Sequence, residues 1–153
     1  MNKIPPILAT AALIALAILA PTSAHATGDT LQDRVDQVLE DYPGGTQIGA
    51  GEISWNGGEI VLTLAGGVSL ASVGSCATGS FCAYTGTSLS GTRISFTNCT
   101  GTNSVAPLGS PVRSFANARS AGTVGAFNGG TVVDSTPAGT YKNTTATITR
   151  LGC

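Results

Sequence analysis

The chain has 153 residues, of which 42% are hydrophobic and 10% charged, and its formal net charge at pH 7 is −1. This length suits one domain with room for a small appended element. The nearly balanced charge excludes a strongly basic surface, so we expect no binding to nucleic acid or to a charged membrane surface.

Residues 1–26 are predicted to be a secretory signal peptide. The apolar run over 7–20 is shorter than the roughly 20 residues that a membrane-spanning helix needs. Ala24 and Ala26 provide small residues at both positions that signal peptidase requires, so we expect cleavage before Thr27. The alternative is an uncleaved anchor. We expect a secreted, extracellular protein with no stable membrane insertion after cleavage.

Cleavage removes the only histidine of the chain, His25. The mature protein would then have no Ser-His-Asp triad, no Cys-His pair and no His-ligated zinc. An enzyme would depend on carboxylates, hydroxyls and Lys142, and a nucleophile needs a base beside it. We therefore expect no catalytic residues, no cofactor and no bound metal.

The segment 27–70 is predicted to form a short amphipathic helix followed by a β-hairpin. Thr30 can cap the helix, with Asp33 three residues later, and Pro43 ends it. Between these limits apolar residues recur with the helical period, at Leu31, Val35, Val38, Leu39 and Tyr42.

The hairpin is predicted from the dipeptide Asn56-Gly57, which separates two runs of alternating apolar residues. Trp55, just before this turn, is either a packing residue or a ligand platform, and packing is the usual role. Glu52 and Glu59 flank the hairpin, and two carboxylates at a defined separation can hydrolyse a glycosidic bond. The register of the hairpin need not bring them together, so we do not expect catalysis there.

The segment 71–153 is predicted to be an all-β domain. Pro107 and Pro111 place residues 100–111 in a connection instead of a strand. Short β-type runs separated by turns rich in Gly, Pro and Asn indicate a β-sandwich or a small barrel. These runs are 81–84, 92–97, 112–117, 123–127, 130–135 and 145–151.

The four cysteines are Cys76, Cys82, Cys99 and Cys153, and in an exported chain they predict two disulfides. Three pairings are possible. A glycine-containing turn of five residues can bring Cys76 to Cys82, which leaves Cys99 for Cys153. A four-thiolate metal site is the alternative, but the expected CxxC knuckles are absent.

The cysteines belong to a longer pattern, C-x5-C-x-Y-x6-G-x4-F-x2-C, which consists of Cys76, Cys82, Tyr84, Gly91, Phe96 and Cys99. The spacing from Tyr84 to Gly91 resembles the Greek-key signature of the βγ-crystallin superfamily. The whole pattern, with residues 114–117 and Cys153, is similar to the actinobacterial secreted peptidase inhibitors of that fold, relatives of the streptomycete metalloproteinase inhibitors. The resemblance covers roughly half of the chain, residues 75–153.

The resemblance implies a βγ-crystallin-like Greek-key sandwich with two motifs. The second motif is degenerate here, because the sequence after Phe127 does not repeat the aromatic-x6-glycine spacing. The function implied is inhibition of an extracellular protease by a rigid loop of a monomeric β-domain. No residue of that inhibitory loop can be assigned from the pattern. The alternative is a non-inhibitory binding or structural β-module, secreted or at the cell surface.

Many βγ-crystallin domains bind calcium through a short motif of Asn, Asp, Ser and Thr. The nearest stretch here, residues 116–121, keeps Asn117 and Ser120 but carries Arg119 and lacks the first acidic or amide residue and the last serine. Ca²⁺ takes six to eight oxygen ligands, so this set is too small. We expect Asn117 to bond to a turn instead.

Overall fold

The structure is a computed structural model that describes residues 30–66 and 76–153. The predicted signal peptide and its cleavage site lie outside these ranges, as does the predicted boundary between the segments 27–70 and 71–153. Within the described ranges, no helix has the length and apolar character to cross a membrane.

The predicted helix is confirmed as α1 (Leu31–Asp41), which begins after Thr30. The Thr30 hydroxyl accepts the N–H of Asp33, and the Asp33 carboxylate accepts the N–H of Thr30. These hydrogen bonds hold the pKa of Asp33 below its usual value of 3.8. One face of the helix points inward, and Val35 on that face is fully buried.

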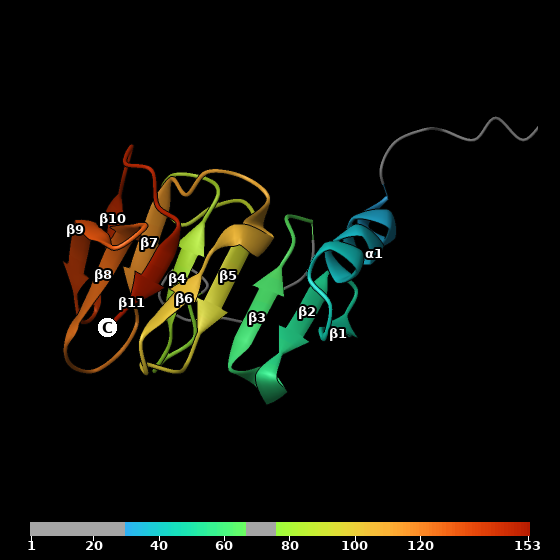
Figure 1. Cartoon of the computed structure of the whole chain (residues 1–153), viewed down its shortest axis with the longest axis horizontal. Helices are drawn as coiled ribbons and strands as arrows, with labels where there is room; N and C mark the ends of the chain where they lie inside the picture. The colour runs from blue at the N-terminus through green and yellow to red at the C-terminus, as the bar shows by residue number, and fades with distance from the viewer. Residues whose placement is uncertain (1–29, 67–75) are drawn as a thin grey trace, which may run out of the picture.

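Seven antiparallel strands form the larger sheet, here called sheet A (Figure 1), in the order β1-β2-β3-β5-β4-β7-β10. Its strands are β1 (Thr46–Gly49), β2 (Glu52–Trp55), β3 (Ile60–Thr63), β4 (Phe81–Tyr84), β5 (Arg93–Phe96), β7 (Ser114–Asn117) and β10 (Thr140–Asn143). The predicted hairpin is β2 and β3, and a single-turn 3-10 helix, η1 (Asn56–Gly58), lies at its tip. Because β3 pairs with β5, the hairpin extends the same sheet as the later strands.

Four further strands form the smaller sheet B, in the order β6-β11-β8-β9. They are β6 (Thr102–Ser104), β8 (Thr123–Asn128), β9 (Thr131–Pro137) and β11 (Arg150–Gly152). A second single-turn 3-10 helix, η2 (Ala106–Leu108), connects β6 toward β7. The structure is thus mostly antiparallel sheet with one short helix, which confirms the prediction of an all-β sandwich.

The main core lies on one face of sheet A, between α1 at one end and sheet B at the other (Figure 1). Strand β4 shows the alternation expected for a sheet, because Phe81 and Ala83 face this core while Cys82 and Tyr84 face the opposite side. The rings of Phe81 and Phe96 pack with their centroids 5.3 Å apart. The largest other contributors are Val35, Ile53, Leu62, Ile94, Phe115, Val124 and Leu151.

The opposite face of sheet A carries a second, smaller apolar cluster, and Tyr84 is fully buried within it. The chain after Tyr84 turns back over this face, and Leu89 packs against the cluster. Gly91 has a φ of +82°, which favours glycine, and the Thr85 side chain occupies the place of any Cβ at this position. Gly91 therefore lets the chain tuck back over this face beside Tyr84.

Several strand predictions were wrong. Residues 100–111 are not only a connection, because 102–104 form β6 and pair with β11. Of the predicted strand 145–151, only the last two residues are paired, as the start of β11 (Arg150–Gly152), and Ile148 is buried without continuing the ladder. Strands β1 and β10 were not predicted, because their side chains are largely exposed and lack an apolar alternation.

Candidate functional site

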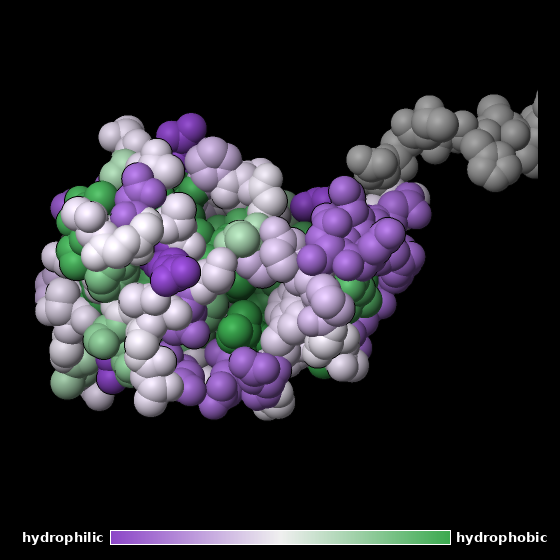
Figure 2. All heavy atoms as spheres, viewed as in Figure 1, coloured by the Kyte–Doolittle hydropathy of each residue, from purple (hydrophilic) through white to green (hydrophobic). Residues whose placement is uncertain are grey.

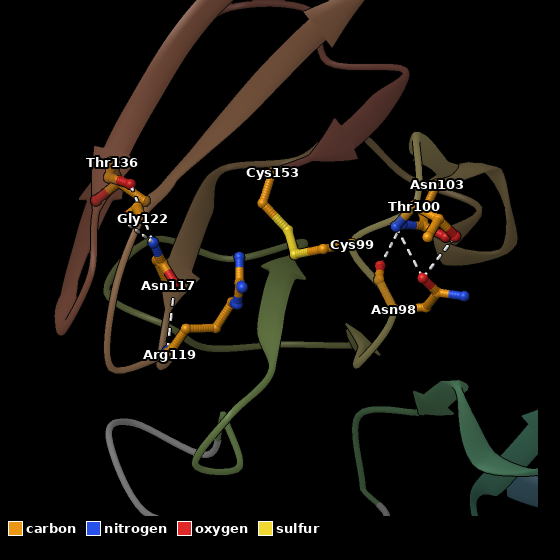
Figure 3. The surroundings of a disulfide bond; sticks show 9 residues. All are labelled: Asn98, Cys99, Thr100, Asn103, Asn117, Arg119, Gly122, Thr136 and Cys153. Atoms are coloured by element: carbon orange, nitrogen blue, oxygen red, sulfur yellow. Dashed lines mark hydrogen bonds between the residues drawn. A yellow bond between two sulfur atoms is a disulfide. The ribbon is translucent and has the colours of Figure 1, made fainter.

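The two disulfides have the predicted pairing. Cys76 and Cys82 are joined with a Cα–Cα distance of 5.9 Å, and both are fully buried under sheet A. Cys99 and Cys153 are joined with a Cα–Cα distance of 5.3 Å (Figure 3). The second link ties the loop between β5 and β6 to the end of β11, so it connects the two sheets.

The loop between β5 and β6, residues 97–101, is partly exposed and is held by contacts to other parts of the chain. At its first residue, the Thr97 N–H donates to the carbonyl of Glu59 at 3.0 Å. The Asn98 side-chain amide then donates to the Glu59 carboxylate at 3.3 Å. The start of the 97–101 loop is thereby anchored to the tip of the β2–β3 hairpin.

The same loop is also fixed from within (Figure 3). The Asn98 side-chain oxygen accepts the N–H of Thr100 at 2.8 Å and its hydroxyl at 2.7 Å, which forms an Asx turn. The amide of Asn103 donates to the backbone carbonyl of Asn98 at 3.2 Å. Together with the Cys99 disulfide, these bonds hold both sides of an exposed backbone segment in one conformation.

Chemically, the 97–101 loop offers exposed Thr and Gly residues and no titratable group. It therefore suits recognition by backbone and hydroxyl contacts instead of catalysis. Because its geometry is fixed before any partner arrives, docking would cost little conformational entropy. If a peptide bond within the loop were cleaved, the two new chain ends would stay close together. The Cys99 disulfide and the hydrogen bond of Asn103 are separate interactions that hold them.

A second braced loop, residues 85–92, differs in where it lies. Its backbone N–H groups at Ser88 and Leu89 donate to the side chains of Asn143 and Ser114. Leu89 packs on the apolar cluster around Tyr84. The 85–92 loop therefore covers the outer face of sheet A, and its polar groups are used to hold it there.

Asn117, the residue kept from the calcium-binding pattern, is fully buried at the end of β7 (Figure 3). Its amide donates to the carbonyl of Gly122 at 3.1 Å and to that of Thr136 at 3.4 Å. Its side-chain oxygen accepts the N–H of Arg119. Asn117 thus fixes the turn into β8, as the structural interpretation of the sequence predicted.

Glu52 and Glu59 are not brought together, because they lie at opposite ends of the β2–β3 ladder. The Glu52 carboxylate accepts the hydroxyl of Thr63 at 3.1 Å and lies 3.9 Å from the guanidinium of Arg93. Glu59 bonds instead to the 97–101 loop. Both carboxylates therefore take part in structural contacts.

Asn98 and Asn103 were not predicted as site residues. The Asn-x-Thr spacing of Asn98 and Thr100 is compatible with an Asx turn, so part of the signal was available. The bond from Asn103 depends on the path of the chain into β6, a strand that was not predicted. Across residues 30–66 and 76–153, no three His, Cys, Asp or Glu residues are grouped closely enough to hold a metal ion.

Comparison with family models, curated proteins and solved structures found no match to this chain.

Proposed function

We propose that this protein is a secreted peptidase inhibitor that docks the 97–101 loop on an extracellular protease. The observation that carries the proposal is the bracing of this exposed loop by one disulfide and by the side chains of Asn98 and Asn103. A protease binds an accessible backbone segment, and a pre-organised segment binds with a smaller entropic cost. The resemblance of the cysteine and Tyr84–Gly91 pattern to the βγ-crystallin-like inhibitors supports the same proposal.

Within this proposal, the chain from Cys76 onward is a βγ-crystallin-like Greek-key domain, and the helix and hairpin extend it. The hairpin also has a direct part in the site, because Glu59 at its tip anchors Thr97 and Asn98. The protein acts as a monomer outside the cell, without a cofactor, and its partner is the protease itself.

The test is a titration of the oxidised protein against a thermolysin-type and a subtilisin-type protease, with residual activity as the readout. We expect a sharp break near one equivalent for one of the two classes. Undiminished activity at a large excess of uncleaved protein would overturn the proposal and favour a non-inhibitory β-module.

A pair of variants tests the assignment of the loop. Thr100→Lys adds a long charged side chain to the 97–101 loop, and Thr87→Lys adds the same group to an exposed position of the 85–92 loop. We expect Thr100→Lys to weaken inhibition at least about tenfold, because it disturbs the centre of the contact, and Thr87→Lys to leave inhibition unchanged. The reverse result would assign docking to the 85–92 loop instead.

A further inference from the structure

Three neighbouring hollows lie around the segment 104–110, which runs from the last residue of β6 through η2. Their volumes are about 490, 290 and 260 Å³, and they share lining residues, with Ser104, Pro107 and Ser110 each lining two of them. Figure 2 shows hydrophobic residues gathering in the middle of this face, between the polar surface over α1 and the surface over sheet B. Each hollow is close to or within the range of small-molecule sites, roughly 300–1,000 Å³.

The smallest of the three is named here the Trp55 hollow. Its apolar lining includes Tyr42, Trp55, Ile60 and Pro107, and its polar lining consists of Asn56 and Ser104. These residues come from the end of α1, the tip of the β2–β3 hairpin and the segment after β6. Pairing of β3 with β5 brings the hairpin beside the later part of the chain.

The indole of Trp55 is held in a fixed position although it is only partly buried. Its ring N–H donates to the backbone carbonyl of Tyr42 at 3.0 Å. The ring also lies against Gly45, where an added Cβ would come within 2.7 Å of two indole atoms. The glycine and the hydrogen bond thus orient an aromatic ring that packs against the main core on one side and lines an open hollow on the other.

The polar groups of the Trp55 hollow are neutral. Asn56 is exposed, and within the described ranges its side-chain amide has no hydrogen-bond partner, so it can both donate and accept. Ser104 accepts the N–H of Ala106 through its hydroxyl oxygen, and that hydroxyl can still donate. No Asp, Glu, Lys or Arg lines this hollow.

We propose that the Trp55 hollow binds a neutral oligosaccharide. A pyranose ring has C–H bonds on its faces and hydroxyl groups at its edges, so it can lie against an aromatic ring while its edges bond to amide and hydroxyl groups. Trp55 and Tyr42 supply the aromatic surface, and Asn56 and Ser104 supply the neutral partners. An anionic ligand would find no cation in this hollow, and a lipid chain would leave Asn56 without a partner.

The neighbouring hollows indicate an oligosaccharide instead of a single sugar. Pro107 and Tyr42 also line the hollow of about 290 Å³, and Ser104 also lines the hollow of about 490 Å³. A chain of sugar rings that starts on Trp55 can therefore continue in either direction around the segment 104–110. Neutral side chains, including Gln37, Ser110 and Asn128, line these continuations, and the charged Arg34, Asp41 and Arg150 line other parts of them.

The experiment uses the fact that the chain contains one tryptophan, so its fluorescence reports on this hollow alone. The oxidised protein is titrated with cellohexaose and with chitohexaose, and calorimetry provides an independent binding curve. We expect a saturable change in tryptophan emission with at least one of these probes.

Variants then locate the bound sugar. Tyr42→Ala removes one aromatic wall while the backbone carbonyl that holds Trp55 remains, and Asn56→Gly removes the amide at a position whose φ of +52° suits glycine. We expect each to lower the affinity at least about tenfold, equivalent to 1.4 kcal/mol. The matched control is Tyr141→Ala, an exposed tyrosine on β10 at the far end of sheet A, which should change nothing.

Absence of any emission change and of any calorimetric signal at millimolar oligosaccharide would overturn the proposal. Binding of a decaproline peptide in place of both sugars would also overturn it and identify a peptide site. Equal loss of sugar affinity in Tyr141→Ala would place the sugar elsewhere. The proposal is independent of protease inhibition, because Tyr42→Ala should still inhibit and Thr100→Lys should still bind the sugar.

Discussion

At one end of sheet A, helix α1 covers β2 and β3. Val35 of the helix, Ile53 of β2 and Leu62 of β3 are fully buried there, and the described residues of this end include no disulfide. At the other end, sheet B covers β4 and β7, where Phe81, Phe115 and Leu151 are fully buried, and two disulfides fix the surrounding loops. The comparison teaches that both ends of one continuous sheet are stabilised by apolar burial, and that the end with more irregular connections between its strands adds covalent links.

The largest expected effect comes from removing the long-range disulfide. Cys99 and Cys153 are 54 residues apart, so the double variant Cys99→Ala/Cys153→Ala should lose about 4 kcal/mol of the free energy of unfolding. Cys76 and Cys82 are only 6 apart, and their replacement should cost about 2 kcal/mol. Urea unfolding measures both values. A larger loss from the short disulfide would mean that packing around Tyr84, and not loop closure, dominates this end.

The other end should be sensitive to a cavity. Val35→Ala removes two buried methyl groups beneath α1 and should lower the free energy of unfolding by about 2 kcal/mol. The matched control is Val132→Ala on β9, where the side chain is 57% exposed and the change should stay within about 0.5 kcal/mol. Equal losses in the two variants would contradict the assignment of apolar burial to the α1 end.

The smallest expected effect concerns Asp134 and Lys142, which link β9 to β10 across the edges of the two sheets. Partial burial alone would raise the pKa of Asp134, but the hydrogen bond and charge of Lys142, with the N–H of Ser135 and the hydroxyl of Thr144, lower it below 3.8. The resulting stability is present above that ordinary pKa and is lost as the pH falls through the lower folded value.

Lys142→Met should therefore raise the pKa of Asp134 and reduce the free energy of unfolding at neutral pH by less than about 1 kcal/mol. An NMR titration of the Asp134 carboxyl, with unfolding followed across the acidic range, measures both changes. An unchanged Asp134 pKa in Lys142→Met would show that the ion pair does not form in solution.

The sequence predicted the elements whose signals are local. The α1 helix has a capping residue, a periodic apolar face and a terminating proline, and the β2–β3 hairpin has Asn56-Gly57 between alternating runs. Strand β1, with Ile48 exposed, and the wholly exposed β10 carry no such local signal. They are strands because a neighbouring strand offers hydrogen bonds, which is a property of the sheet and not of the segment.

The candidate sites were harder to predict for the same reason. The 97–101 loop owes its rigidity to Glu59 and Asn103. Glu59 meets the loop only after β3 pairs with β5, and Asn103 meets it only when the chain turns into β6. The Trp55 hollow similarly combines residues near positions 42, 56 and 104. The disulfides were predictable in part, because the short spacing of Cys76 and Cys82 left one remaining pair.

The order of strands in sheet A also determines how the chain must assemble. Strand β4 lies between β5 and β7 in the sheet, and both of these strands follow it in the sequence. Strand β3, which precedes β4, pairs with β5 and not with β4. Strand β4 therefore cannot be added in the order of synthesis and must wait for partners downstream. Sheets built from such non-local pairings fold on the order of milliseconds to seconds, so β4, whose four residues are all buried in the folded protein, has a long unpaired lifetime.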